Sequence, residues 1–129
     1  MNLNDEQIEL KEAVEKLIFN GCNYKIETLA DLYDRDLRIV IVNLDDSVIA
    51  LNYQENLNFF IAKRDSGAAP LDTTAHFRHI EVVGKSGYVV VVRQVQLSDK
   101  PQRFVFSLNL RLTEKGWKVY RETAVATSI

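Results

Sequence analysis

Three polar residues are of types that bind ligands or transfer protons. Each lies on the same face of its expected strand as apolar side chains, which the sheet must bury. His76 and Arg78 lie in the strand expected over residues 73–83, and Arg121 lies in the strand expected over residues 117–127. Strict alternation along a strand places all three on the apolar, inner face. An imidazole exchanges protons near neutral pH, and a guanidinium binds carboxylate or carbonyl oxygens. The residues that mark the inner face are Ile80 and Val82 in the first strand and Trp117 and Val119 in the second.

These three residues predict the polar end of a cavity between a sheet and its helices. Aromatic side chains of the expected helices, Tyr33, Tyr53 and Phe60, would form its walls. A planar ligand with carbonyl or carboxylate groups would suit that lining. A purely structural explanation is also open, in which the strands extend past the helices and both arginines reach water at one end of the sheet.

Other residues with chemical potential do not predict a second site. His76 and His79 are three positions apart on a strand, so their rings point to opposite faces and cannot share a metal ion. The segment Gly84-Lys85-Ser86 lacks the earlier glycine and the following helix of a phosphate-binding loop. Cys22 is a lone cysteine, and a buried thiol is the favoured interpretation over a nucleophile. We expect no metal, no cofactor and no catalytic residue, with His76 as the one candidate base.

Composition limits the class of protein and its partners. The chain has 129 residues, 47% hydrophobic and 26% charged, which is typical of one soluble globular domain over residues 1–129. Sixteen basic against eighteen acidic residues leave no excess of positive charge for nucleic acid or a membrane surface. The acidic, polar N-terminus and the single cysteine favour a cytoplasmic location.

The hydrophobic period changes along the chain from helical to strand-like. Helices are expected from Asn4 to Gly21, after a cap at Asn23, and from Asn52 to Gly67. Alternating or β-branched runs predict strands, the last four joined as an antiparallel meander. This order indicates an α+β domain with helices on one face of a sheet. The expected strands cover residues 37–44, 48–51, 73–83, 88–97, 103–113 and 117–127, with a turn at 98–101.

Three short stretches match a known superfamily. The stretches Leu32–Leu37, Ile80–Gly84 and Gly116–Val119 resemble sequences of the nuclear-transport-factor-2-like superfamily, in particular the bacterial group named for lumazine binding. The resemblance implies the cone-shaped α+β fold of ketosteroid isomerases and scytalone dehydratases. In that fold three N-terminal helices pack on a curved, mainly antiparallel sheet of about six strands.

The same resemblance argues against ketosteroid isomerase activity. The position of the isomerase's proton-shuttling aspartate holds Ile41, which cannot move a proton. We therefore expect a small-molecule-binding protein. An isomerase, dehydratase or cyclase with His76 as base and a pure association module are the alternatives. The ligand hypothesis depends on His76 and Arg121 projecting into the hollow of the cone.

Apolar residues on the outer sheet face predict a homodimer. Val105, Phe77 and Tyr120 are expected there, and two copies would meet sheet to sheet. In an alternative interpretation, Phe77 and Tyr120 form a cross-strand pair and bind no partner.

Overall fold

The computed structural model describes residues 1–97 and 99–129 and has an α+β architecture. Two helices precede the first strand, and the third helix follows the second strand. The expectation of three N-terminal helices is therefore wrong for the third helix. No helix in the described residues is long and apolar enough to cross a membrane. The elements are α1 (Asp5–Cys22), α2 (Ile26–Leu32), β1 (Tyr33–Val42), β2 (Val48–Asn52), α3 (Tyr53–Asp65), β3 (His76–Val83), β4 (Ser86–Val95), β5 (Gln102–Thr113) and β6 (Gly116–Thr127).

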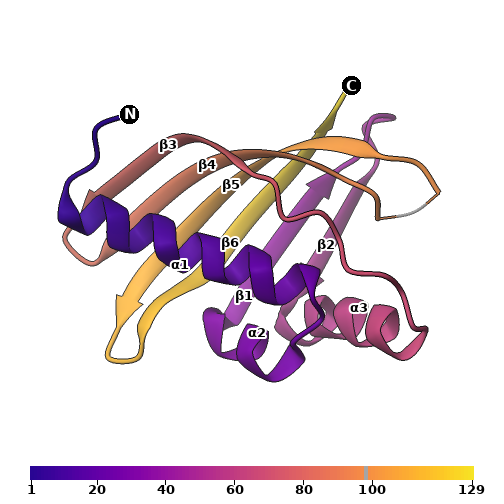
Figure 1. The fold of residues 1–129 in the computed structure, drawn as a ribbon, viewed down its shortest axis with the longest axis horizontal. Helices are drawn as coiled ribbons and strands as arrows, with labels where there is room; N and C mark the ends of the chain where they lie inside the picture. The colour runs from indigo at the N-terminus through magenta and orange to yellow at the C-terminus, as the bar shows by residue number, and fades with distance from the viewer. Residues whose placement is uncertain (98) are drawn as a thin grey trace.

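The strands form one mixed sheet in the order β2-β1-β6-β5-β4-β3. The strands β3 to β6 form the expected antiparallel meander, and β1 pairs with β6 in parallel. All three helices lie on one side of the sheet, with α1 crossing it diagonally, so none of the described residues forms a helix on the opposite face (Figure 1). The turn expected at 98–101 begins at Ser98, which lies outside the described residues.

The helices expected to start at Asn4 and at Asn52 both begin with a capping box. The Asn4 side chain accepts a hydrogen bond from the Gln7 amide at 2.9 Å, and the Gln7 side chain accepts one from the Asn4 amide. Asn52 and Glu55 repeat the arrangement at the start of α3. Reciprocal bonds of this kind satisfy amides that the first helical turn leaves free.

The connection between α1 and α2 differs from the expectation. Gly21 does not end α1 in a left-handed conformation, since the helix continues to Cys22 and Tyr24 adopts the positive φ of 53°. Asn23 does not cap α2, whose first turn follows Lys25 without a side-chain cap. Position 21 therefore remains in the helix, where it faces Phe60 of α3.

A β-bulge in β6 reverses the side on which the following residues point. Leu110 lies opposite Val119, but its neighbour Asn109 lies opposite Arg121, so Tyr120 is an extra residue in β6. An extra residue breaks the alternation of faces along a strand. Val119 thus faces the helices, Arg121 faces away from them, and Glu122 faces the helices again.

A second bulge has the same effect in β3. Phe77 lies opposite Val91 and His79 lies opposite Val90, which makes Arg78 the extra residue. Phe77 therefore faces the helices and packs against the core, with the Lys11 ammonium 5.3 Å from its ring centroid. Its expected place on the outer face is wrong, and so is the proposed pair with Tyr120, because β5 and β4 lie between β6 and β3 in the sheet.

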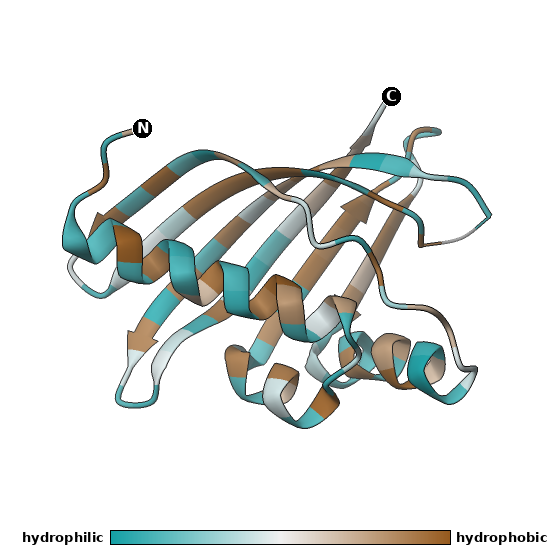
Figure 2. Ribbon diagram, in the orientation of Figure 1, coloured by the Kyte–Doolittle hydropathy of each residue, from teal (hydrophilic) through white to brown (hydrophobic). Residues whose placement is uncertain are grey.

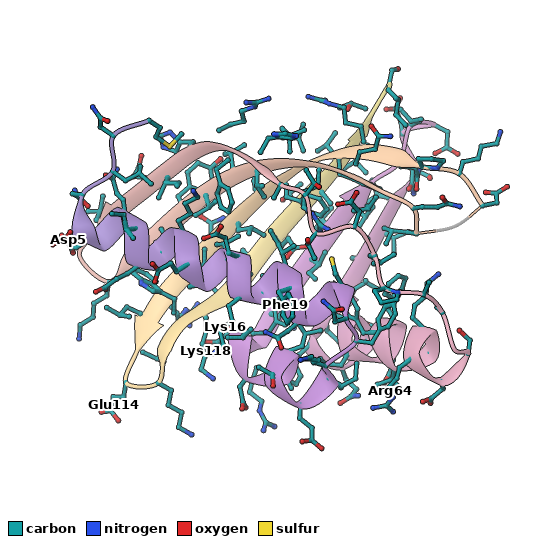
Figure 3. All side chains as sticks on the ribbon, in the orientation of Figure 1. Asp5, Lys16, Phe19, Arg64, Glu114 and Lys118 are labelled. Atoms are coloured by element: carbon teal, nitrogen blue, oxygen red, sulfur yellow. The ribbon has the colours of Figure 1, made fainter. Side chains whose placement is uncertain are left out.

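The core lies between α1 and the sheet, where side chains from both fill the space (Figure 3). Brown, hydrophobic bands alternate with teal bands along the strands, as one buried face requires (Figure 2). Gly87 of β4 sits directly beneath α1. A Cβ atom there would lie 2.8 and 2.9 Å from the methyl carbons of Leu10 and 3.2 Å from the Trp117 ring. Leu10 is fully buried, so its side chain cannot turn out into solvent to make room.

We predict that Gly87→Ala destabilises the protein by about 1–3 kcal/mol, the usual cost of overpacking a tight core. Urea denaturation followed by circular dichroism measures the change. Ser86→Ala, at the exposed neighbouring position, is the control and should leave the midpoint unchanged. Equal midpoints for Gly87→Ala and the wild-type protein would contradict the close approach of α1.

Candidate functional site

A cavity of about 150 Å³ lies between α1, α3 and the helix-facing side of the sheet. Its walls are mainly aliphatic and aromatic, as in most small-molecule sites. Gly21 of α1 and Ala124 of β6 also line the cavity, and their small size leaves space open. The larger apolar wall residues include Leu17, Ile18, Phe60, Val91, Phe106 and Leu108.

Glu122 is the acidic residue of the cavity wall, and the bulge at Tyr120 turns it inward. Burial raises the pKa of its carboxyl group to about 7, although the positive charge of Arg93 acts in the opposite direction. No lysine or arginine of the described residues forms an ion pair with it. A carboxyl group that titrates near neutral pH can serve as either a proton donor or a proton acceptor.

Tyr33 and Asn56 contribute a phenol and an amide to the same cavity. Burial and the nearby Glu122 carboxyl raise the pKa of Tyr33 far above its usual range, while the Asn56 side chain and Arg93 act in the opposite direction. Tyr33 therefore stays a neutral hydrogen-bond donor. Asn56 is only 5% exposed, and its Nδ2 group makes no hydrogen bond of good geometry within the described residues.

Arg93 of β4 joins the cavity wall to the segment that precedes β3. Its Nη2 donates to the carbonyl oxygen of Asp72 at 2.7 Å and to Cys22 Sγ at 3.1 Å, and its Nε donates to the carbonyl oxygen of Thr74 at 3.4 Å. The guanidinium also lies 6.0 Å from the ring centroid of Phe106. Burial raises the pKa of the Cys22 thiol in spite of Arg93, so the thiol stays protonated.

The three predicted aromatic residues divide between two places. Tyr33 and Phe60 line the cavity, although Tyr33 does so as the first residue of β1 and not from a helix. Tyr53 does not line it. The Tyr53 hydroxyl donates to the carbonyl oxygen of Ala30 at 2.9 Å, and the Arg35 guanidinium lies 5.5 Å from its ring centroid.

The three predicted polar residues lie outside the cavity, and their expected inward orientation is wrong. His76, Arg78 and Arg121 are all exposed. His76 precedes the bulge in β3 and pairs with Val92 on the outer face, and Arg78 is itself the bulged residue. Arg121 follows the bulge in β6. The ligand hypothesis in the form that needed His76 and Arg121 is therefore wrong, and other residues supply the polar groups of the cavity.

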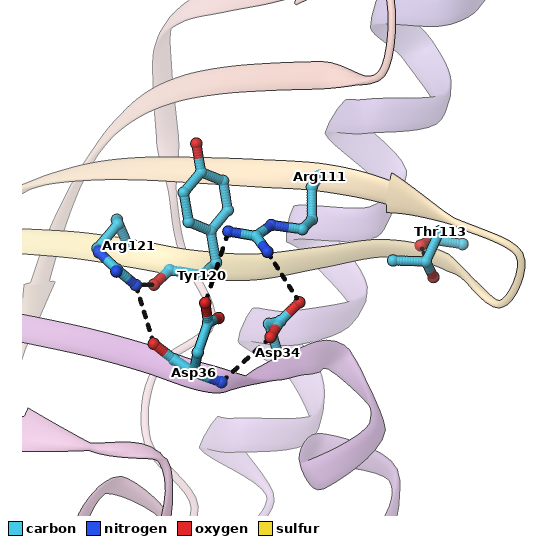
Figure 4. A network of polar contacts seen from close by, with 7 residues as sticks. Asp34, Asp36, Arg111, Thr113, Tyr120 and Arg121 are labelled. Carbon is cyan, nitrogen blue, oxygen red and sulfur yellow. Dashed lines mark hydrogen bonds and ion pairs between the residues drawn. The ribbon is translucent and has the colours of Figure 1, made fainter.

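Arg121 instead binds backbone on the outer face (Figure 4). Its Nη1 donates to the carbonyl oxygens of Tyr120 at 2.6 Å and Asp36 at 2.9 Å. The Arg111 guanidinium lies 3.9 Å from the Tyr120 ring centroid and within 3.7 Å of Asp34. These contacts satisfy the carbonyl of the extra residue, Tyr120, at the bulge after which Arg121 faces outward and Glu122 faces inward.

Sequence reasoning missed Asn56, Arg93 and Glu122. A signal existed for Arg93, which interrupts the valine run of β4, and for Asn56, which precedes Phe59 and Phe60 by three and four helical positions. The sequence contains no such signal for Glu122, because unbroken alternation along the strand places its side chain on the outer face.

The comparisons with known proteins rest on structure. No protein-family model matches the chain, and no curated protein matches it. A solved NTF2-like protein from Cytophaga hutchinsonii has a TM-score of 0.74 at 17% identity, covering 97% of this chain and 100% of that one. A solved NTF2-like protein of unknown function from Shewanella baltica has a TM-score of 0.72 at 17% identity, covering 99% of this chain and 100% of that one.

A ketosteroid isomerase-like protein from Erwinia carotovora atroseptica gives a TM-score of 0.68 at 12% identity, covering 98% of this chain and 100% of that one. At these identities the likeness concerns the fold. The resemblance to the lumazine-binding group stays a prediction. The chain has the NTF2-like, cystatin-like cone fold.

Proposed function

We propose that the protein binds a small, largely apolar molecule whose oxygen atom accepts a hydrogen bond from Asn56 Nδ2. The carrying observation is that the Nδ2 atom of this amide is buried on an apolar cavity wall beside Tyr33 and makes no hydrogen bond of good geometry to any described residue. A buried, unsatisfied polar group costs about 1–3 kcal/mol. A ligand oxygen would restore the missing hydrogen bond, and the apolar walls would hold the rest of the molecule.

The convergence of several polar groups supports the same proposal. Tyr33 offers a neutral hydroxyl beside Asn56, and Glu122 reaches the cavity from β6. A void left only by imperfect packing is apolar, whereas ligand sites combine apolar walls with a few convergent polar groups. The cavity has the second composition.

Asn56→Leu tests the proposal because it separates stability from binding. Replacing an unsatisfied buried amide by an apolar side chain of similar size should leave the unliganded protein at least as stable as the wild type. The same change should weaken binding of small ketones, aldehydes and phenols by about tenfold or more. Thermal shift and calorimetric titration with a panel of these compounds measure both effects.

Asn58→Leu is the matched control, since Asn58 lies on the exposed side of the same helix. It should leave the affinities unchanged. A panel that binds neither the wild type nor the variants, or binds both equally, would contradict the proposed function.

The position of Glu122 favours proton transfer as a second candidate function. Its carboxylate would remove a proton from the carbon beside a ligand carbonyl, leaving the electron pair on an enolate. Tyr33 and Asn56 would donate hydrogen bonds to the enolate oxygen. The proton would then return from Glu122 to the same carbon or to another, so the reaction is an exchange or an isomerisation.

Hydrogen–deuterium exchange at the α-carbons of cyclohexanone, followed by NMR in heavy water, tests this candidate. The exchange rate should rise with pH through about 7, because only the ionised carboxylate accepts a proton. Glu122→Gln should lower the rate by about 10²-fold or more. His76→Ala should leave it unchanged, and a Glu122→Gln rate equal to that of the wild type would exclude proton transfer.

We also propose that two copies associate through the outer face of the sheet. Five valines lie in register across five neighbouring strands on the face without helices. Two identical apolar rows complement each other when a two-fold axis brings them together. The row consists of Val92, Val105, Val125, Val42 and Val48.

Val105→Glu, within this row, should convert a dimer into a monomer, because the row would bury an unpaired charge. Light scattering after size-exclusion chromatography measures the mass. Val83→Glu, at a position 68% exposed near the end of β3, should leave the dimer intact. A wild-type protein that is monomeric at high concentration would contradict the association.

A further inference from the structure

The cavity is small for a ligand site. Its volume of about 150 Å³ equals that of an apolar protein cavity that holds one benzene ring, whereas drug-sized ligands occupy about 300–1,000 Å³. Leu17, Val91 and Leu108 of its walls are at most 6% exposed, and tightly packed walls expand only at a cost. The enclosed space therefore has room for one six-membered ring, and a fused second ring would have to extend through the open side or displace wall side chains.

Polar groups reach this space from two sides. Asn56 approaches from α3, beside the first residue of β1, while Arg93 approaches from β4. The strands β6 and β5 lie between β1 and β4 in the sheet. A ring held between the two residues can thus meet a hydrogen-bond donor at one end and a positive charge at the other.

Arg93 retains donor capacity and charge. Of its five N–H groups, those on Nε and Nη2 bind Thr74, Cys22 and Asp72, while Nη1 makes no hydrogen bond to any described residue. None of the carboxylates in the described part of the chain forms an ion pair with it. A guanidinium keeps its proton in proteins, so a charge on an apolar wall favours an anionic partner.

We propose that the ligand is a single-ring carboxylate, with its anionic group on Arg93 Nη1 and a hydroxyl or carbonyl oxygen at the far end of the ring on Asn56 Nδ2. This inference rests on the proposed binding function and names its ligand class. It narrows the expectation of a planar ligand with carbonyl or carboxylate groups to a single ring that carries both an acid and a second oxygen.

Three probes that differ by one feature each test the proposal by calorimetric titration. The first is 4-hydroxybenzoate, which has one ring, a hydroxyl group and a carboxylate. The second, 4-hydroxybenzamide, lacks the charge, and the third, 6-hydroxy-2-naphthoate, adds a ring. We expect 4-hydroxybenzoate to bind about tenfold or more tightly than either of the others, as expected for a charge-assisted contact and a size limit.

Variants locate the two determinants. Arg93→Gln should remove the preference for the acid over the amide, a ratio that a merely structural loss would not change. Arg78→Gln, at an exposed arginine of the same sheet, should leave the ratio as it is. Ala124→Val adds methyl groups to the cavity wall and should weaken 4-hydroxybenzoate binding by about tenfold.

The outcomes separate this inference from the function on which it rests. Equal affinity for the acid and the amide would overturn the role of Arg93. Binding of the naphthoate as tightly as the benzoate would overturn the size limit. Failure of all three probes, while neutral ketones or phenols bind in an Asn56-dependent way, would overturn the ligand class and leave the binding function standing. If neither set binds, both fail.

Discussion

The extra residue in β6 is the constraint on which the site depends. Val119 must face the helices because the core closes over it, and alternation from that point would place Arg121 inside and Glu122 outside. The bulge at Tyr120 exchanges the two, so the side chain that cannot lose its charge faces solvent and the side chain that can take up a proton faces the cavity. Arg121 contributes to this arrangement from the outer face, since its guanidinium binds the Tyr120 and Asp36 carbonyl oxygens.

The electrostatics of the cavity follow from that exchange. Glu122 is half-buried on the cavity wall without an ion-pair partner among the described residues, and the neutral form of its carboxyl is favoured up to a pH of about 7. A group that binds its proton more tightly in the folded chain than in the unfolded one stabilises the fold less as pH rises toward that value. Arg93 keeps its charge, held by contacts with the segment before β3. The cavity therefore combines a titratable acid, a permanent cation and two neutral donors, an arrangement suited to binding and orienting a ligand.

The sequence was sufficient for the α+β fold, apart from the expected N-terminal place of the third helix, and misleading for the site. Local sequence patterns predict the helix starts at Asn4 and Asn52, the change from a helical to a strand period, and the meander. Each of these matches the structure. Local sequence predicts which side of the sheet a strand residue faces only while the strand is regular. A bulge depends on the register of both neighbouring strands, which a single sequence does not contain, so one inserted residue in β3 misplaced His76 and another in β6 misplaced Arg121. Tyr33 and Phe60 were found because their burial follows from apolar patterns that no bulge interrupts.

The orientation of Glu122 is the central claim, and its carboxyl carbon reports it directly. A carbon-detected NMR titration of protein labelled at glutamate, with the signal assigned through Glu122→Gln, gives the pKa of this one group. We expect an inward-facing carboxyl on the cavity wall to titrate with a midpoint of about 7. A midpoint near 4.5, the value of an ordinary glutamate, would show that the side chain faces water, and the site described above would then not exist.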